Sequence, residues 1–400
     1  GAGHSVVAGV RDPEKFARRF PAIEARACDF NRLLDPTGWA PLVRGCDAVV
    51  NCAGVLQTRR GDDATAIHEQ GPRALFQAAE AAGVRRVVQV SAVSVGADTE
   101  YARSKLGGDS ALMALDLDWI VLRPSLVYGR MAWGGTALLR SLAAMPFVSP
   151  VPGDGRQAFQ PVHVSDVCET VVWALDSPDA PRHIVEPCGP ETASLRDVIA
   201  RYRGWLGLKP APVLEMPLPL VRLASRLGDV FGTGALTSTS LAQIEFGNAS
   251  DPHAFTQATG IRPRAMAEAL AQEPAGPAEL WQARLLLLRP LVRAALALLW
   301  LISGVLGLFA TEELARHVGP ALAPWLAASS GAWDILLALL VAFSLRPRLA
   351  FWLQFGSVLA YTAALTLTEP ALWLDLYGPV LKNLPILALI LVHRVLEEER

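Results

Sequence analysis

The chain has 400 residues, more than one ordinary domain, so we expect at least two folded units. Hydrophobic residues make up 52% and charged residues only 18%, which is below the ~25% charged residues of typical soluble proteins and excludes a wholly water-exposed chain. The formal net charge is −2 and no basic run is visible, which argues against a nucleic-acid-binding protein and leaves a small molecule and a membrane as the expected partners.

Short apolar segments rich in β-branched residues alternate with helical patterns in the first part of the chain. The expected strands are residues 6–10, 48–53, 86–93, 119–127 and 183–188, and the expected helices between them are 64–83 and 100–115. Strands that alternate with helices favour βαβ units and a parallel sheet covered on both faces. We therefore predict an α/β domain with a Rossmann-type, doubly wound parallel sheet over residues 1–275.

Residues 131–275 are less regular than the segments before them. Prolines and glycines interrupt the pattern, and Ser194 and Asp197 have the spacing of a capping box at a helix start. We expect a small substrate lobe at the carboxyl edge of the sheet, ended by a linker of Pro, Ala and Glu over residues 272–278.

The last part of the chain predicts an all-α, four-helix transmembrane domain over residues 276–400. Residues 291–392 contain only ten charged side chains. The expected spans are residues 294–310, 331–345, 349–368 and 376–392. They are apolar on all sides, which disfavours a soluble helical bundle. Arginines flank the spans on one side, so we expect a multi-pass protein of a bacterial-type inner (plasma) membrane, with the α/β domain and both termini in the cytoplasm.

A few polar side chains stand out chemically. Tyr101 and Lys105 are four residues apart on one helix face, where an ammonium group would lower the pKa of the phenol and suit it to acid/base work. Ser91 lies at the carboxyl end of an expected strand, where its hydroxyl could bond the reacting oxygen, and Ser94 is the alternative. Asp334 is either a functional acid inside the membrane or a first-turn residue favoured by the helix dipole.

Five dispersed cysteines form no CxxC pair and no Cys/His cluster, so we predict no metal site and a reduced, cytoplasmic setting.

Several motifs occur in an order that resembles the short-chain dehydrogenase/reductase superfamily, in its extended and atypical branches. The matching segments are residues 6–13, 28–30, 51–54, 123–129 and 161–167, together with Ser91, Tyr101 and Lys105. The resemblance implies that Tyr101 is the acid/base, that Lys105 also holds a ribose, and that Ser91 orients the substrate. The implied cofactor contacts are Arg11, Asp29, Phe30, Asn51, Ala53, Gly54, Pro124 and Ser125.

The family's first strand and Gly-rich phosphate loop have no counterpart here. Residues 1–4 resemble the tail of the helix that follows such a loop, so we expect roughly 25 further residues upstream. Arg11 could pair with a 2′-phosphate, which favours NADP as cofactor, while Asp12 keeps NAD open.

Residues 285–395 resemble the DoxX-like membrane family, in the four-span layout and in the segment 378–385. Together the resemblances imply a membrane-anchored NAD(P)-dependent oxidoreductase, or an epimerase- or dehydratase-like enzyme, with a lipophilic or quinone-like substrate or a membrane redox partner. The alternative is a catalytically silent, NAD(P)-binding scaffold or sensor of a membrane redox complex, similar to the accessory-subunit branch of respiratory complex I.

Overall fold

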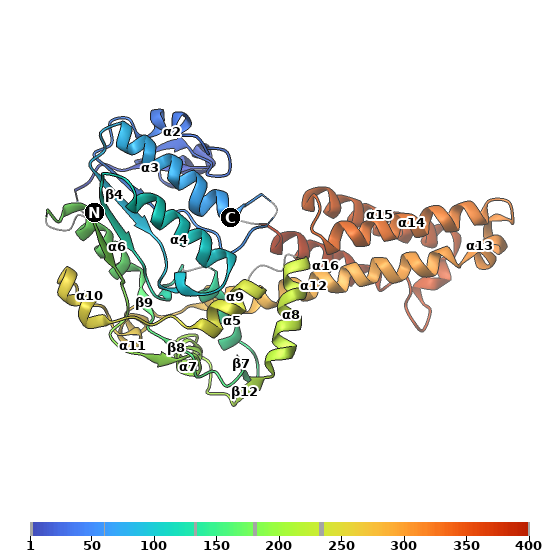
Figure 1. Ribbon diagram of the computed structural model, residues 1–400. Coiled ribbons are helices and arrows are strands. Elements are labelled where there is room, and N and C mark those ends of the chain that lie inside the picture. The colour runs from blue at the N-terminus through green and yellow to red at the C-terminus, as the bar shows by residue number, and fades with distance from the viewer. Residues whose placement is uncertain (1–2, 60, 132–133, 179–181, 232–235, 399–400) are drawn as a thin grey trace. The chain divides into compact units, whose positions relative to one another are not determined.

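The protein is described by a computed structural model that covers residues 3–59, 61–131, 134–178, 182–231 and 236–398 (Figure 1). The chain forms two compact units. The first contains residues 1–226 and 234–280, and the second contains residues 227–233 and 281–400.

The first unit contains the predicted parallel sheet. Its four strands, in the order β10-β5-β4-β3, are β3 (Ala48–Asn51), β4 (Arg86–Val90), β5 (Asp118–Leu122) and β10 (His183–Val185). A second parallel pair is formed by β1 (Val7–Val10) and β2 (Glu24–Ala27), which carry α1 (Pro13–Arg19) between them. The Rossmann-like α/β architecture expected from the sequence is therefore confirmed.

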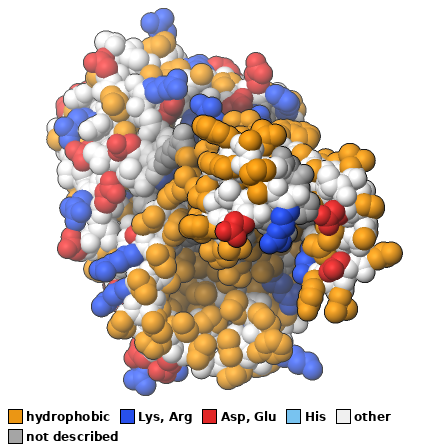
Figure 2. Space-filling view, turned by 90° about the vertical axis from the view of Figure 1, so that its right-hand side faces the viewer, with side chains coloured by type: hydrophobic (Ala, Val, Ile, Leu, Met, Phe, Trp, Pro, Cys, Tyr) orange, Lys and Arg blue, Asp and Glu red, His pale blue; other side chains and the backbone are white. Residues whose placement is uncertain are grey.

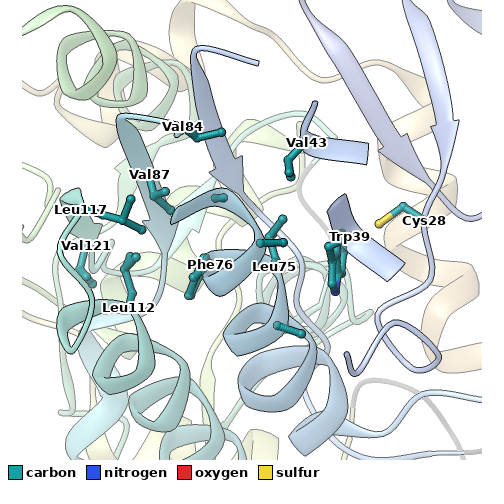
Figure 3. Packing of buried hydrophobic residues seen from close by; sticks show 13 residues of the cluster. Cys28, Trp39, Val43, Leu75, Phe76, Val84, Val87, Leu112, Leu117 and Val121 are labelled. Atoms are coloured by element: carbon teal, nitrogen blue, oxygen red, sulfur yellow. The ribbon is translucent and has the colours of Figure 1, made fainter. Parts of the chain in front are cut away.

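Apolar residues on both faces of the strands explain why the sheet is buried. Val87 of β4 and Val121 of β5 pack with Phe76 of α3 (Gly71–Ala81) and Leu112 of α4 (Glu100–Met113), as Figure 3 shows. The alternate residue Val88 packs on the opposite face, in a cluster that includes residues of α6 (Val164–Asp176). Because successive strand residues point to opposite faces, continuous apolar strands require helices on both sides.

Several elements end earlier than their apolar patterns suggest. The expected strand 119–127 ends at Leu122, and the backbone amides of Arg123 and Ser125 donate to the carbonyls of Val185, the last residue of β10, and of Pro187. The expected strand 86–93 ends at Val90, after which residues 93–96 form a 3₁₀ turn. The expected helix 64–83 starts as the π-helix η1 (Ala66–Gln70) and continues as α3.

A lobe of short strands and helices begins after β5, and β10 returns the chain to the sheet before the lobe continues. Ser194 and Asp197 form the predicted capping box at the start of α7. The main elements of the lobe are α5 (Gly135–Ala143), β7 (Ser149–Pro152), α7 (Leu195–Trp205), β12 (Val213–Met216), α9 (Ser238–Phe246), α10 (Pro252–Thr259) and α11 (Met266–Gln272). Helix α8 (Leu218–Phe231) begins in this lobe, and its residues from Leu227 onward belong to the second unit.

The second unit is helical. Its helices are α12 (Pro277–Leu308), α13 (Thr311–Val318), α14 (Ala323–Ala342), α15 (Pro347–Thr368) and α16 (Asn383–Leu396). Among the described residues, α12, α14 and α15 are long and apolar enough to cross a membrane. Figure 2 shows hydrophobic side chains over much of the surface turned toward the viewer, with few charged groups among them.

The predicted spans differ from these helices mainly in where they begin. α12 begins at Pro277, 17 residues before the predicted start of the first span. α14 begins at Ala323 instead of residue 331, because the small residues of 327–330 continue the helix. α16 begins at Asn383 instead of residue 376, and its 14 residues extend about 21 Å, less than the ~30 Å of a bilayer core. The fourth predicted span is therefore a shorter helix than expected.

Two glycines let α4 lie directly against η1. A Cβ atom at Gly108 would lie 2.0 Å from the carbonyl oxygen of His68, and one at Gly107 would lie 2.5 Å from the Glu69 carboxylate. Since the first of these neighbours is backbone, it cannot rotate away. The position of α4 over the sheet therefore depends on the missing side chain of Gly108.

We predict opposite effects for two helical Gly→Ala substitutions in the first unit. Gly108→Ala should reduce the free energy of unfolding by about 1–3 kcal/mol, because the new methyl group overpacks the contact with η1. Gly204→Ala in α7 should raise it by up to ~1 kcal/mol, since no atom lies within 4 Å of the added Cβ and alanine favours helix. Thermal unfolding in detergent measures both. Equal effects of the two substitutions would contradict the close packing.

Candidate functional site

One face of α4 carries three ionisable side chains at four-residue spacing, namely Tyr101, Lys105 and Asp109. The helix starts at the N-cap Thr99, whose hydroxyl accepts a hydrogen bond from the Ala102 amide. The four-residue spacing places the three side chains along one side of the helix. This side faces the loops that follow β3 and β4, as the contacts of Lys105 and Asp109 show.

Lys105 is fixed at the carboxyl edge of the sheet. Its Nζ donates to the carbonyl oxygen of Ala53, 3.2 Å away, and to that of Val90, 3.1 Å away. Only 4% of the residue is exposed. Burial lowers the pKa of Lys105 to about 8, although the nearby Asp109 carboxylate opposes this shift. The ammonium group thus ties the loop after β3 to the end of β4.

Tyr101 has a pKa that moves in the opposite direction from the expectation. Burial, with a smaller contribution from the negative charge of Asp109, raises the pKa of its phenol to about 12. The predicted lowering by Lys105 is therefore wrong for this state, because the lysine is directed at two backbone carbonyls. The Tyr101 ring lies edge-on to His68, with centroids 5.4 Å apart. At neutral pH the phenol keeps its proton and can act as a hydrogen-bond donor.

Asp109 is a site residue that the motif analysis missed. It is fully buried, and its Oδ2 accepts from Ser91 Oγ at 2.9 Å and from Arg123 Nε and Nη2, both at 3.0 Å. Burial raises the pKa of the carboxyl group, while the bonds to Ser91 and Arg123 lower it. Its position four residues after Lys105 was the available signal. Ser91, predicted to orient the substrate, donates a hydrogen bond from its hydroxyl to the Asp109 carboxylate in this structure.

His68 holds the loop after β3 from the other side. The Val55 amide donates to His68 Nε2 at 2.9 Å, so the ring proton is on Nδ1, which lies 2.9 Å from Ser104 Oγ. Burial and the charge of Lys105 lower the pKa of His68 to about 3. The histidine is therefore neutral at physiological pH, and its tautomer is set by these two partners.

A cavity of about 450 Å³ lies between β1 and β3, whose facing edges do not pair. Its inner part is apolar, whereas its polar rim lies at the carboxyl ends of β1, β2 and β3. Six of the eight predicted cofactor contacts line it: Arg11, Asp29, Phe30, Asn51, Ala53 and Gly54. Parallel sheets commonly bind ligands at this edge.

The other predicted site residues lie outside this cavity. Ser125 donates through its hydroxyl to the carbonyl of Gln160 and through its amide to the carbonyl of Pro187 at 2.9 Å. The Pro124 carbonyl accepts from the Val93 amide at 3.0 Å. Gly54 lines the cavity and also lies next to Lys105 of α4. A Cβ atom at this glycine would lie 3.2 Å from Lys105 Nζ and 3.5 Å from His68 Nε2.

Three residues of the cavity rim already have protein partners. Arg11 forms an ion pair with Asp62, at 2.8 Å between Nη1 and Oδ1. Asp29 accepts from the Asn31 amide at 3.0 Å. Asn51 is buried, and its amide donates to Gln89 Oε1 at 2.8 Å. A ligand at this rim would therefore meet side chains whose orientation is largely fixed.

Asp334 lies in the middle of α14, which excludes the first-turn alternative. It is buried within the second unit, and its carboxylate accepts from Ser303 Oγ at 2.8 Å and from Tyr361 OH at 2.9 Å. These donors come from α12 and α15. Within the described residues, no group of three His, Cys, Asp or Glu side chains is placed to hold a metal ion.

Each of the two units contains a segment that matches a known protein family. Residues 1–134 match the NAD(P)H-binding family, and residues 297–391 match the DoxX-like family. The chain joins an NAD(P)-binding, Rossmann-type domain to a DoxX-like membrane domain. The sequence-based recognition of both parts is therefore confirmed.

Among curated proteins, the chain is 29% identical over 194 residues to subunit 9 of the NADH dehydrogenase [ubiquinone] 1 alpha subcomplex from Mus musculus, covering 48% of this chain and 50% of the relative. It is 25% identical over 199 residues to a ceramide reductase from Caulobacter vibrioides, covering 50% of this chain and 61% of the relative. The chain thus spans only about half to three fifths of the length of these relatives.

Among solved structures, the fold is similar to that of MoeE5 in complex with UDP-glucuronic acid and NAD. The TM-score is 0.51 at 19% sequence identity, and the match covers 68% of this chain and 89% of that chain. The same protein in complex with UDP-glucose and NAD gives a TM-score of 0.52, again at 19% identity, over 71% of this chain and 91% of that chain. At this identity the likeness supports the fold.

We predict a pH-dependent stability that originates in Lys105. Between pH 8 and 10.5 the unfolded lysine keeps its proton while the folded one has lost it, so unfolding takes up a proton. The free energy of unfolding should then rise with pH, by at most about 1.4 kcal/mol per pH unit. Burial raises the thiol pKa of Cys28 and Cys188, which lowers stability over part of the same pH range, so the quantity to measure is a difference between two proteins. In thermal unfolding from pH 8 to 10, the wild type should gain stability relative to Lys105→Met. The same slope in both proteins would contradict the burial of the ammonium group.

Proposed function

We propose that the chain is a membrane-anchored NAD(P)-dependent oxidoreductase of the short-chain dehydrogenase/reductase type. The observation that carries the proposal is the position of Lys105, held between the Ala53 and Val90 carbonyls and on the same helix face as Tyr101. A cation and a phenol are thereby presented at the carboxyl edge of a parallel sheet, beside a cavity lined by the residues expected to hold a dinucleotide.

The residues present fit such a cofactor. The absence of a side chain at Gly54 leaves the path between the cavity and Lys105 Nζ open. Asp29 and Phe30 would contact the adenosine end, and Asn51 keeps the loop to Gly54 in place through its bonds to Gln89 Oε1 and the Ala53 amide. When bound, the cofactor supplies or accepts a hydride.

The side chains of α4 would then carry out the proton transfer that accompanies hydride transfer. Tyr101, protonated at neutral pH, is suited to donate its proton to an oxygen that becomes negative as a carbonyl is reduced. The positive charge of Lys105 would stabilise the phenolate that remains. Ser91 is held in orientation by Asp109, and a substrate oxygen would compete with that carboxylate for the Ser91 hydroxyl.

Arg11 favours NADP over NAD in this proposal. Its guanidinium lines the cavity at the end of β1 and is paired with Asp62. A 2′-phosphate carries more charge than one carboxylate and could take over this arginine. Arg59 also contacts Asp62, at 3.4 Å, so the carboxylate would keep a partner after such an exchange.

The membrane domain suggests a lipophilic substrate. The ceramide reductase among the relatives is named for a lipid substrate, which supports a substrate class that partitions into a bilayer. Arginines at one end of the spans support a cytoplasmic NAD(P)-binding domain in a bacterial-type inner membrane. An epimerase- or dehydratase-like reaction would use the same Tyr101 and Lys105 with a sugar-like substrate.

The cavity also supports the expectation of an additional strand. The facing edges of β1 and β3 leave backbone donors and acceptors without strand partners, and apolar side chains such as Val7 and Val49 line the space between them. We propose that a parallel strand encoded upstream of Gly1, followed by a Gly-rich turn, occupies the inner part of this cavity.

Tyr101→Phe tests the catalytic proposal. We expect turnover to fall by about a hundredfold or more, with NADPH affinity unchanged, because only the transferable proton is lost. The measurement is NADPH oxidation in detergent with a panel of long-chain ketones and quinones. Tyr202→Phe is the matched control, since Tyr202 is buried and its hydroxyl has no hydrogen-bond partner in the described structure.

The alternative is an NAD(P)-binding scaffold without turnover. One observation favours it, namely the 29% identity to a protein named as a subunit of an NADH dehydrogenase. In that case Tyr101→Phe would change neither NADPH binding nor the association of the chain with its membrane complex, and no substrate would be consumed by the wild type.

A further inference from the structure

We propose that α8 is an interfacial helix whose exposed apolar side inserts into the boundary of the bilayer that the second unit crosses. This inference concerns membrane contact and does not depend on the proposed catalytic function. It rests on the three faces of α8 and on the contacts made by its last residues.

The three faces of α8 differ sharply in chemistry. At 100° per residue, one face carries Ser225 and Gly228, which are buried. A second face is charged. A third face forms an apolar stripe that is exposed in the part of the chain that the structure describes. The stripe residues and their exposed fractions are Leu220 56%, Leu223 57%, Leu227 51% and Val230 63%. The charged residues are Arg222, Arg226 and Asp229.

Exposure of four large aliphatic side chains on one helix is costly in water. Each of the four keeps more than half of its surface exposed, and removing that apolar area from water would be favourable. Scattered exposed leucines are ordinary, but a continuous stripe along three helical turns indicates a contact surface. The question is therefore which partner covers it.

The last residues of α8 belong to the second unit, which contains the helices able to cross a membrane. This points to lipid as the partner of the apolar stripe. The carbonyl oxygen of Phe231 accepts from Arg293 Nη1 of α12 at 2.8 Å, and the Phe231 ring stacks on Phe343 at 5.8 Å. Phe343 is the C-cap residue of α14 and lies three residues before Arg346 and five before Arg348. The end of α8 therefore lies where the spanning helices begin or end.

The length of α12 gives the depth of this contact. Arg293 lies 15 residues before Leu308, or about 22 Å along the helix. With Leu308 at one face of a bilayer core of ~30 Å, Arg293 lies in the third of the core next to the opposite face. Arg293 also pairs with Glu397 at 2.6 Å, and Arg289 pairs with the same carboxylate at 3.1 Å. Such a buried ionic group is expected near a membrane boundary, where charges retain access to polar surroundings.

An interfacial helix has the composition seen in α8. Apolar side chains enter the acyl region while arginines on an adjoining face meet the headgroups. A second copy of the chain is a weaker candidate partner. A stable dimer buries about 800 Å² on each partner, and a single stripe of four side chains offers less than that. Lipid requires no such minimum area.

Site-directed fluorescence can test the assignment on the full chain in lipid nanodiscs. An environment-sensitive dye would be attached to Leu223→Cys or Leu227→Cys, with Arg226→Cys as the control on the charged face of the same helix. The background carries serine at Cys46, Cys52 and Cys168, the cysteines that are not buried. These three labelling positions are exposed, so the fold should be retained, which circular dichroism checks.

The dyes at residues 223 and 227 should emit at shorter wavelength than the dye at 226. Lipids brominated in the upper acyl chain should quench them several-fold more strongly. Equal, water-like emission and weak quenching at all three positions would overturn the proposal. It would also be overturned if Leu223→Cys formed a disulfide between two copies while its dye was shielded from the brominated lipids, because a second copy would then cover the stripe.

Discussion

A buried ammonium group at the carboxyl edge of a parallel sheet is the constraint on which the candidate site depends. Lys105 reaches this edge because Gly108 lets α4 approach η1 closely, and its Nζ then bonds the carbonyls of Ala53 and Val90. Burial, with a smaller contribution from the same charge, lowers the pKa of His68, which keeps this histidine neutral and able to accept a hydrogen bond from the Val55 amide. Packing, backbone conformation and electrostatics at the site therefore originate in one helix–helix contact.

Much of the fold could be predicted from the sequence because its signals are local. Apolar runs of β-branched residues marked the strands of the sheet, and long uncharged segments marked α12 and α15. The ends of elements were less predictable. Strand β5 stops at Leu122 although the Arg123 amide still bonds to Val185 of β10, and α14 starts early because alanines and serines continue it. Those outcomes depend on tertiary contacts or on residues without a strong preference.

The candidate site also combines features that the local sequence predicts with features that depend on tertiary contacts. The four-residue spacing of Tyr101 and Lys105 was sufficient to place both on one helix face. The sequence did not reveal that Asp109 would bind Ser91 and Arg123, since these residues meet only through the order of strands β4 and β5. The direction of the Tyr101 pKa shift could not be predicted from the sequence either, because it depends on burial and on which atoms the Lys105 ammonium group contacts.

The central claim is that the cavity beside Lys105 binds a nicotinamide dinucleotide. The most direct test is a fluorescence titration of NADPH and NADH with the protein in detergent, including any residues encoded upstream of Gly1. The account predicts that NADPH binds more tightly than NADH, that Lys105→Met weakens both about tenfold, and that Arg11→Ala removes the preference for NADPH. Absence of binding for both nucleotides, or binding that is unaffected by Lys105→Met, would contradict it.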